Sequence, residues 1–103
     1  MVDLNRIEGF DWDDGNTRKS AEKHAVSQGE AEQVFLNEPF VIEDPKHSLD
    51  ESRFHALGKT DNGRTLHITF TLRRDGAFIR VISARDMSRK ERAFYEQESG
   101  EQT

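Results

Sequence analysis

The sequence contains no cysteine among its 103 residues, which excludes both a disulfide framework and a thiolate metal site. It also lacks any apolar run near the roughly 18 residues that a transmembrane helix requires, and its first residues, MVDLNRIEGF, contain no signal-peptide core. Hydrophobic residues make up only 33% of the chain, against 34% charged residues. We therefore expect a soluble cytoplasmic protein with one modest core, in which seven Phe, one Trp and one Tyr supply much of the buried area.

Charge is distributed unevenly along the chain, although the formal net charge is only -5. Residues 1–52 contain 5 basic and 13 acidic side chains, residues 53–95 contain 10 basic and 4 acidic ones, and residues 96–103 contain three acidic ones. The three segments therefore carry -8, +6 and -3. This asymmetry indicates a polyanion site or a charged protein partner, and the alternative is a chance sorting of surface charges.

The basic charge is concentrated in the segment FIRVISARDMSRKERAFY, which spans residues 78–95. A strand with an arginine at its middle is followed there by a short basic helix that ends in a phenol. Its cations and the phenol are Arg80, Arg85, Arg89, Lys90, Arg92 and Tyr95. Arginine binds planar anions through two parallel hydrogen bonds, so phosphate is the first ligand that this segment suggests.

Two short helices are predicted in the first part of the chain. Asp13 or Asp14 caps the first helix, which runs to about His24. Ser27 and Glu30 form a capping box for the second, whose apolar residues recur at helical spacing until it ends near residue 37. Extended segments are predicted before and after this pair, at residues 10–12 and 40–42.

Two turn signals predict a meander of three antiparallel strands. Asn62-Gly63 and Asp75-Gly76 each favour a two-residue type I′ hairpin, and residues 65–72 between them alternate between polar and large apolar side chains. With two-residue loops, one face of the meander is a core formed by Leu57, Leu66, Ile68, Phe70, Leu72, Ile79 and Val81. The other face then contains Phe54, Ala56, His67, Thr69, Thr71, Arg80 and Ile82.

The second face is interpreted as the floor of a ligand cleft, because it places Arg80 in a central strand beside Thr71, with His67 further along. The alternative is that Arg80 pairs with an acidic residue of a covering loop. In a regular strand Arg85 would point to the opposite side, since a step of five residues is odd. Arg85 would then lie beyond the end of the strand or serve the structure.

A last helix completes the predicted fold. Ser88 and Glu91 form its capping box, and it runs to about Ser99. We expect residues 1–103 to form a single α+β domain with two N-terminal helices, an antiparallel sheet of about four strands with the meander at its centre, and this C-terminal helix. Residues 96–103 are polar and are expected to be a flexible tail.

The ordered set of motifs resembles the BrnT toxins, a branch of the RelE-like toxins of bacterial type II toxin–antitoxin systems. Two N-terminal motifs of the family, Phe-x-Trp-Asp and Lys-His-Gly-Val, correspond to residues 10–13 and 23–26. Its Arg-Phe-x-x-x-Gly corresponds to residues 53–58, and its Arg-x-Ile-Ser-Ala-Arg to residues 80–85. The family's Arg-x-Glu and Tyr that follow correspond to Arg89, Glu91 and Tyr95. The chain departs from the family in and beside the first helix, at Asn16, Ser20 and Ala25.

The resemblance implies a RelE-like fold and a ribonuclease that cleaves RNA and arrests translation. It also implies a neutralising antitoxin (BrnA-like) with a ribbon-helix-helix part, through which alone operator DNA would be contacted. Cleavage by the 2′-hydroxyl of RNA itself needs a base, cations for the charge on phosphorus, and an acid for the leaving oxygen, and it requires no metal or other cofactor.

The residues that correspond to these roles are candidates for the site. Arg80, Arg85 and Arg53 are the candidates for binding the phosphate and stabilising the negative charge of the transition state. Arg89 and Arg92 are candidates for further contacts to the RNA. Proton transfer falls to Tyr95, His24 or His67, and Lys23 could assist electrostatically. Of the proton carriers only His titrates near neutrality without help. The structural alternatives are that His24 is a cation at a helix end and that Tyr95 seats the last helix on the sheet.

Three functions are therefore considered. The first, which we favour, is a metal-independent ribonuclease toxin. The second is a catalytically weakened toxin homologue that binds the antitoxin in operon autoregulation. The third is a non-catalytic nucleic-acid-binding module, which the acidic charge of residues 1–52 disfavours. That acidic segment could instead offer a complementary surface to a basic antitoxin.

Overall fold

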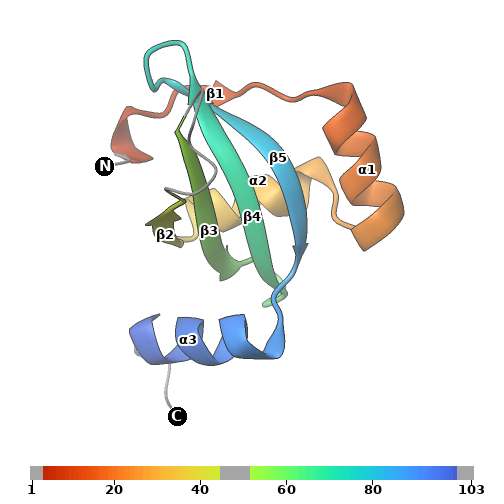
Figure 1. The fold of residues 1–103 in the computed structure, drawn as a ribbon, viewed down its shortest axis with the longest axis vertical. Coiled ribbons are helices and arrows are strands. Elements are labelled where there is room, and N and C mark those ends of the chain that lie inside the picture. The colour runs from red at the N-terminus through yellow and green to blue at the C-terminus, as the bar shows by residue number, and fades with distance from the viewer. Residues whose placement is uncertain (1–3, 45–51, 100–103) are drawn as a thin grey trace.

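The computed structural model describes residues 4–44 and 52–99, without the side chains of residues 16 and 17. These residues form a five-stranded sheet in the order β1-β5-β4-β3-β2, with helices on both of its faces (Figure 1). The elements in chain order are the 3-10 helix η1 (Leu4–Arg6), β1 (Gly9–Phe10), α1 (Asp14–His24), α2 (Gln28–Leu36), β2 (Phe40–Glu43), β3 (Arg53–Lys59), β4 (Thr65–Arg73), β5 (Phe78–Asp86) and α3 (Arg89–Ser99). No helix in the described part of the chain is long and apolar enough to cross a membrane.

The α+β class, the three α-helices and the central meander β3-β4-β5 are confirmed within these residues, but two features of the predicted sheet are wrong. The sheet has five strands rather than about four, and it is mixed rather than antiparallel. The additional strand is β1, which pairs parallel with β5 through Gly9 opposite Phe78 and Phe10 opposite Ile79. The extended segment predicted at residues 10–12 overlaps this strand only at Phe10, and no local pattern in the sequence reveals its parallel pairing with β5.

Both predicted capping boxes are present. At α2, the Ser27 hydroxyl accepts from the Glu30 N–H at 3.1 Å, and the Glu30 carboxylate accepts from the Ser27 N–H at 3.0 Å. At α3, the Ser88 hydroxyl and the Glu91 carboxylate exchange the same two bonds, at 3.2 and 2.9 Å. Because α3 runs to Ser99, the first half of the predicted tail is helical, and residues 100–103 lie outside the described residues.

The hairpin between β3 and β4 differs from the predicted one by one residue. The Thr60 N–H donates to the Arg64 carbonyl at 2.9 Å, and the Gly63 N–H donates to the Thr60 carbonyl at 2.9 Å. Gly63 has a φ of +85°, so the loop is a turn that ends in a left-handed glycine bulge. Leu57 therefore pairs with His67 and lies on the polar face. The predicted faces of β3 are exchanged, and Phe54 and Ala56 belong to the core.

The hairpin between β4 and β5 has the predicted register, but β5 contains a bulge further along. Phe70 pairs with Val81, whereas the preceding residue, Thr69, pairs with Ser83. Ile82 is thus an extra residue in β5. The bulge makes the odd step between Arg80 and Arg85 an even one, so both arginines lie on the same face of the sheet. The expectation that Arg85 would point to the opposite side is therefore wrong.

The core lies between the sheet and α2. The sheet contributes Phe54, Ala56, Leu66, Ile68, Phe70, Ile79, Val81 and Ala84, and α2 contributes Ala31, Val34 and Phe35. Ser20 of α1 is buried, and its hydroxyl accepts from the Ala84 N–H at 3.2 Å, which fixes α1 against β5. Gly58 allows close approach of α2, since a Cβ there would lie 2.9 Å from the Val34 Cγ1 atom.

Arg64 connects the end of α1 to α2 and β5. Its guanidinium donates to Asp86 at 2.7 Å, to Glu30 at 3.1 Å, and to the carbonyls of His24 and Ala25 at 2.9 and 2.8 Å. Its hydrogen bond lowers the pKa of Asp86. Two carbonyl groups at the C-terminus of α1 are satisfied in this way, although Ala25 has a φ of +53° that favours glycine.

Candidate functional site

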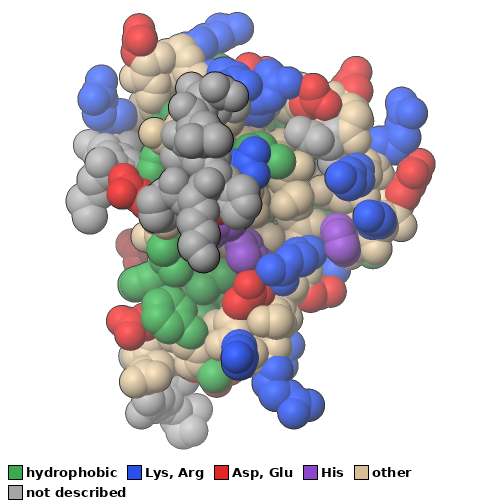
Figure 2. All heavy atoms as spheres, in the orientation of Figure 1, with side chains coloured by type: hydrophobic (Ala, Val, Ile, Leu, Met, Phe, Trp, Pro, Cys, Tyr) green, Lys and Arg blue, Asp and Glu red, His purple; other side chains and the backbone are tan. Residues whose placement is uncertain are grey.

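The face of the sheet opposite α2 contains three cross-strand rows of side chains from β3, β4 and β5. The rows are Arg53-Thr71-Arg80, His55-Thr69-Ser83 and Leu57-His67-Arg85. Helix α3 crosses the sheet at the end where the third row lies (Figure 1). Figure 2 shows His and Arg or Lys side chains in the middle of this view, above a hydrophobic area that leads to α3. The face therefore combines cations, imidazoles and hydroxyl groups, as a site for an anionic ligand requires.

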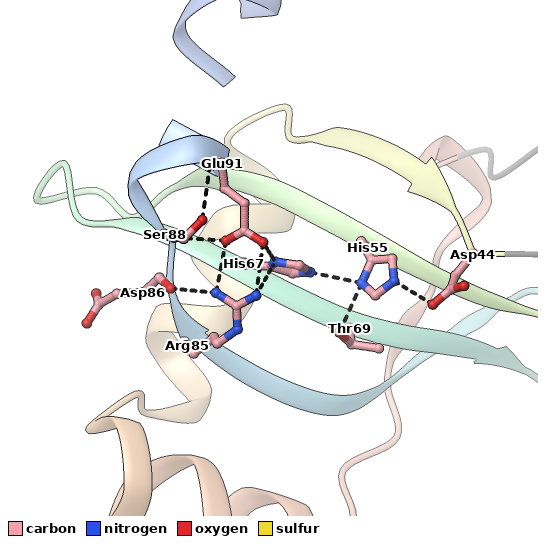
Figure 3. Close-up of polar contacts among 8 residues, drawn as sticks. All are labelled: Asp44, His55, His67, Thr69, Arg85, Asp86, Ser88 and Glu91. Carbon is pink, nitrogen blue, oxygen red and sulfur yellow. Dashed lines mark hydrogen bonds and ion pairs between the residues drawn. The ribbon is translucent and has the colours of Figure 1, made fainter. Parts of the chain in front are cut away.

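Glu91 holds Arg85 and His67 together in the third row (Figure 3). The two terminal nitrogens of Arg85 donate to the two carboxylate oxygens of Glu91, each at 2.9 Å. His67 Nδ1 lies 2.7 Å from Glu91 Oε2. Burial raises the pKa of Glu91, but hydrogen bonds from Arg85, Ser88 and His67 outweigh burial and lower it to about 2. Glu91 is therefore an ionised acceptor whose position is fixed by the capping box of α3.

A chain of imidazoles continues from Glu91 into the second row. His67 Nε2 lies 2.8 Å from His55 Nδ1, and His55 Nε2 lies 2.8 Å from Asp44 Oδ2 (Figure 3). The Thr69 hydroxyl lies 3.1 Å from His55 Nδ1. Burial lowers the pKa of His67, while its hydrogen bond to Glu91 opposes this effect. Two carboxylates thus lie at the ends of the His55–His67 pair, which we call the imidazole pair.

A cavity of about 300 Å³ opens beside the imidazole pair, between the sheet and α3. It is lined by Ile42, His55, Leu57, His67, Lys90, Glu91 and Phe94. The side chains of His55 and His67 are 26% and 13% exposed, so a ligand in the cavity can reach both rings. No group of three His, Asp or Glu side chains in residues 4–44 and 52–99 has an arrangement that could hold a metal ion.

The predicted arginines lie on this face, but they have different surroundings. Arg80 donates to Asp13 at 2.8 Å and lies 3.7 Å from Asp11, so the segment between β1 and α1 supplies carboxylates for it. This pairing is the structural alternative that the sequence left open. Arg53 occupies the same row at the start of β3. Arg85 is the arginine that joins the imidazoles, because Glu91 connects it to His67.

The remaining predicted residues lie apart from the imidazole pair. Lys23 and His24 form the last turn of α1, which packs beside β5. Tyr95 is buried against Leu57 and Met87, as expected of a residue that seats α3 on the sheet. Arg89 and Arg92 are exposed on the first turn of α3.

Three members of the cluster were missed as site residues: Asp44, His55 and Glu91. Glu91 was identified only as a capping residue, because the partners of its carboxylate come from β4 and β5. The predicted register of the first hairpin, which was wrong by one residue, would place His55 on the face opposite to His67. A glycine bulge at Gly63 in place of the type I′ turn would have placed the two imidazoles on the same face.

Comparison with known proteins gives a family and a fold. Residues 12–91 match the family described as "Ribonuclease toxin, BrnT, of type II toxin-antitoxin system". The structure is similar to the 1.1 Å crystal structure of the Brucella abortus ribonuclease toxin BrnT, with a TM-score of 0.57 and 19% sequence identity. That similarity covers 79% of this chain and 97% of the Brucella chain. No curated protein matches the sequence.

Proposed function

Because the chain belongs to the BrnT family of ribonuclease toxins from type II toxin–antitoxin systems, we propose that it is an endoribonuclease that cleaves RNA without a metal. In the proposed reaction the 2′-oxygen attacks the adjacent phosphorus, and the bond from phosphorus to the 5′-oxygen breaks. The products are a 2′,3′-cyclic phosphate and a free 5′-hydroxyl. The protein has to bind the phosphate, stabilise its extra negative charge and move one proton.

The observation that carries this proposal is the position of Arg85 beside His67 on an open face of the sheet. The bulge at Ile82 brings Arg85 to this face, and Glu91 holds its guanidinium 3.0 Å from His67 Nδ1. A cation and a proton carrier at this separation can act on one phosphate group. Of the three candidates for proton transfer we favour His67, since it contacts both Glu91 and Arg85, whereas Tyr95 is buried.

The other cations are proposed as contacts to the RNA backbone. Arg53 and Arg80 lie two rows from Arg85 on the same face and can bind a neighbouring phosphate. Arg89 and Arg92 extend the basic surface along α3. Lys23 is a further candidate for RNA contact from α1. Contacts of this kind make affinity dependent on salt rather than on sequence.

The proposal is tested with purified protein, free of any antitoxin, incubated with RNA in the presence of EDTA. The wild-type protein is expected to cleave the RNA. Arg85→Gln is expected to slow cleavage by roughly 100-fold to 1,000-fold, because it removes a charged donor from the transition state. Arg18→Gln, which changes an exposed arginine on α1, is the matched control and is expected to cleave normally. Intact RNA after incubation with folded wild-type protein would contradict the proposal.

The second candidate function is that of a weakened toxin, which binds its antitoxin in operon autoregulation. It is favoured by the carboxylates that pair with both Arg80 and Arg85. Both functions predict a tight complex with a ribbon-helix-helix protein. Only the ribonuclease arrests growth and translation when the chain is expressed without that partner. Normal growth under confirmed expression of soluble protein would select the second function.

A further inference from the structure

We propose that His55 and His67 share one proton between their facing ring nitrogens and act together as the acid–base pair of RNA cleavage. This inference rests on the proposed ribonuclease function and assigns its proton transfer to two residues acting as a unit.

The outer nitrogens of the pair are both donors. Glu91 accepts at 2.7 Å from His67 Nδ1, and Asp44 accepts at 2.8 Å from His55 Nε2. Arg85 Nη2 also lies 3.0 Å from His67 Nδ1, but it is itself a donor and donates to the same Glu91 oxygen at 2.9 Å, so both nitrogens have Oε2 as their acceptor. A carboxylate has no proton to give, so each of these two nitrogens carries one. With one proton on its outer nitrogen, each of the two rings is neutral.

The inner nitrogens require a third proton. His67 Nε2 and His55 Nδ1 are 2.8 Å apart, which is a hydrogen-bond distance. In two neutral rings with protonated outer nitrogens, both inner nitrogens would present lone pairs to each other. A proton between them replaces this repulsion with a charge-assisted hydrogen bond. The arrangement therefore contains three protons on four ring nitrogens, and the pair carries one positive charge.

The charged groups around the pair fit this count. Asp44 follows β2, Arg85 is on β5, and Glu91 and Lys90 are on α3. The two carboxylates neutralise the charge of Arg85 and that of the shared proton, while Lys90 lines the cavity beside them. Loss of the shared proton would leave two opposed lone pairs, which favours its return, whereas burial lowers the pKa of His67 and favours its release.

This behaviour suits the transfer of one proton during RNA cleavage. The pair without its shared proton accepts the proton of the 2′-hydroxyl as the bond from the 2′-oxygen to phosphorus forms. When the bond from phosphorus to the 5′-oxygen breaks, the pair returns the same proton to that oxygen. The pair ends in its initial state, and no other reactant is needed. Both rings line the cavity, so the exchanged proton can reach a bound substrate.

His55→Asn is the most informative variant. The asparagine side chain can place a hydrogen-bonding atom near the position of Nδ1, facing His67, but it does not titrate. The variant is expected to fold, to lose roughly 100-fold or more in cleavage rate, and to shift the rise of rate with pH that in the wild type reports deprotonation of the pair. Glu22→Gln, an exposed change on α1, is the control for an altered surface charge.

Nitrogen NMR of the imidazole rings, recorded without RNA, tests the shared proton apart from activity. In the wild-type protein His55 and His67 are expected to titrate in coupled steps, and His55→Asn is expected to shift the titration of His67. Independent titration of the two rings, or a His55→Asn variant with the wild-type rate and pH profile, would overturn the inference while the ribonuclease function stands. A wild-type protein that leaves RNA intact would overturn both, even with coupled titration.

Discussion

Arg85 and Glu91 form a two-point ion pair across the junction of β5 and α3, with both hydrogen bonds at 2.9 Å. The same carboxylate accepts from the Ser88 N–H at the start of α3 and contacts His67 on β4. One side chain therefore completes the helix cap and orients the two groups proposed to act on phosphate. Glu91 therefore contributes both to folding stability and to the proposed site, and the dependence of folding stability on protonation of its carboxylate tests the first contribution.

Glu91 is expected to make folding stability depend on pH in acid. Its pKa is about 2 in the folded protein and 4.5 ordinarily, so its contribution is complete above pH 4.5 and is lost as the pH falls toward 2. Urea midpoints of the wild type should fall across this window, and those of Glu91→Gln should fall less. Glutamine retains the capping bond to Ser88, so the variant separates charge from capping. Equal slopes for the two proteins would show that Glu91 is not the group responsible.

Ala25→Gly is expected to stabilise the protein by about 1 kcal/mol. Ala25 has a φ of +53°, a conformation that glycine adopts without the Cβ repulsion that alanine meets. The matched control is Ala21→Gly, an exposed helical position, which should lose about 1 kcal/mol. Thermal unfolding of both variants provides the measurement. A loss at both positions would mean that the left-handed conformation of Ala25 is not strained.

Arg64→Ala is expected to lower the free energy of unfolding by about 2 to 3 kcal/mol. The change leaves Asp86 and Glu30 without their guanidinium partner, and it removes two donors from the C-terminus of α1. Arg64→Lys retains the charge but not the forked geometry, so an intermediate loss is expected. Denaturant titration of the three proteins measures their free energies of unfolding and so gives their order of stability. A Lys variant as stable as the wild type would show that charge alone accounts for the role of Arg64.

Gly58→Ala is expected to destabilise the protein by about 1 to 3 kcal/mol through overpacking. The added Cβ would lie 2.9 Å from the Val34 Cγ1 atom and 3.2 Å from the Pro39 Cβ atom. The comparison variant is Gly29→Ala in α2, where the nearest atom is 4.0 Å away, and it should gain up to about 1 kcal/mol from helix propensity. Melting temperatures that move in opposite directions would confirm the close approach of α2 to β3. A neutral Gly58→Ala would contradict it.

Local signals in the sequence predicted local structure well. The capping boxes at Ser27 and Ser88 were correct because each depends on residues within one helical turn. The register of the first hairpin was wrong because Asn62-Gly63 fits two turn types that differ by one residue. The bulge at Ile82 interrupts the alternation of β5 with two consecutive apolar residues, Val81 and Ile82, and because this interruption was not used, the placement of Arg85 beside His67 was missed.

The sequence predicted the class of ligand that the candidate site would bind, but not which residues form the site. An arginine-rich strand and helix pointed to phosphate from composition alone. The imidazole pair depends on β2, β3, β4 and α3 meeting in space, and such contacts have no spacing rule in the sequence. His55 became recognisable only with the correct pairing of Thr69 opposite it.

The parallel pairing of β1 with β5 fixes an order of assembly during synthesis. Gly9 is synthesised well before its partner Phe78 emerges. The local hairpins of β3 and β4 can form in the meantime, because contacts close in sequence close fastest. Asp13 can meet Arg80 only when β5 has joined the sheet. Until then β4 is an unprotected edge, so a chain released before residue 78 is expected to aggregate rather than to fold.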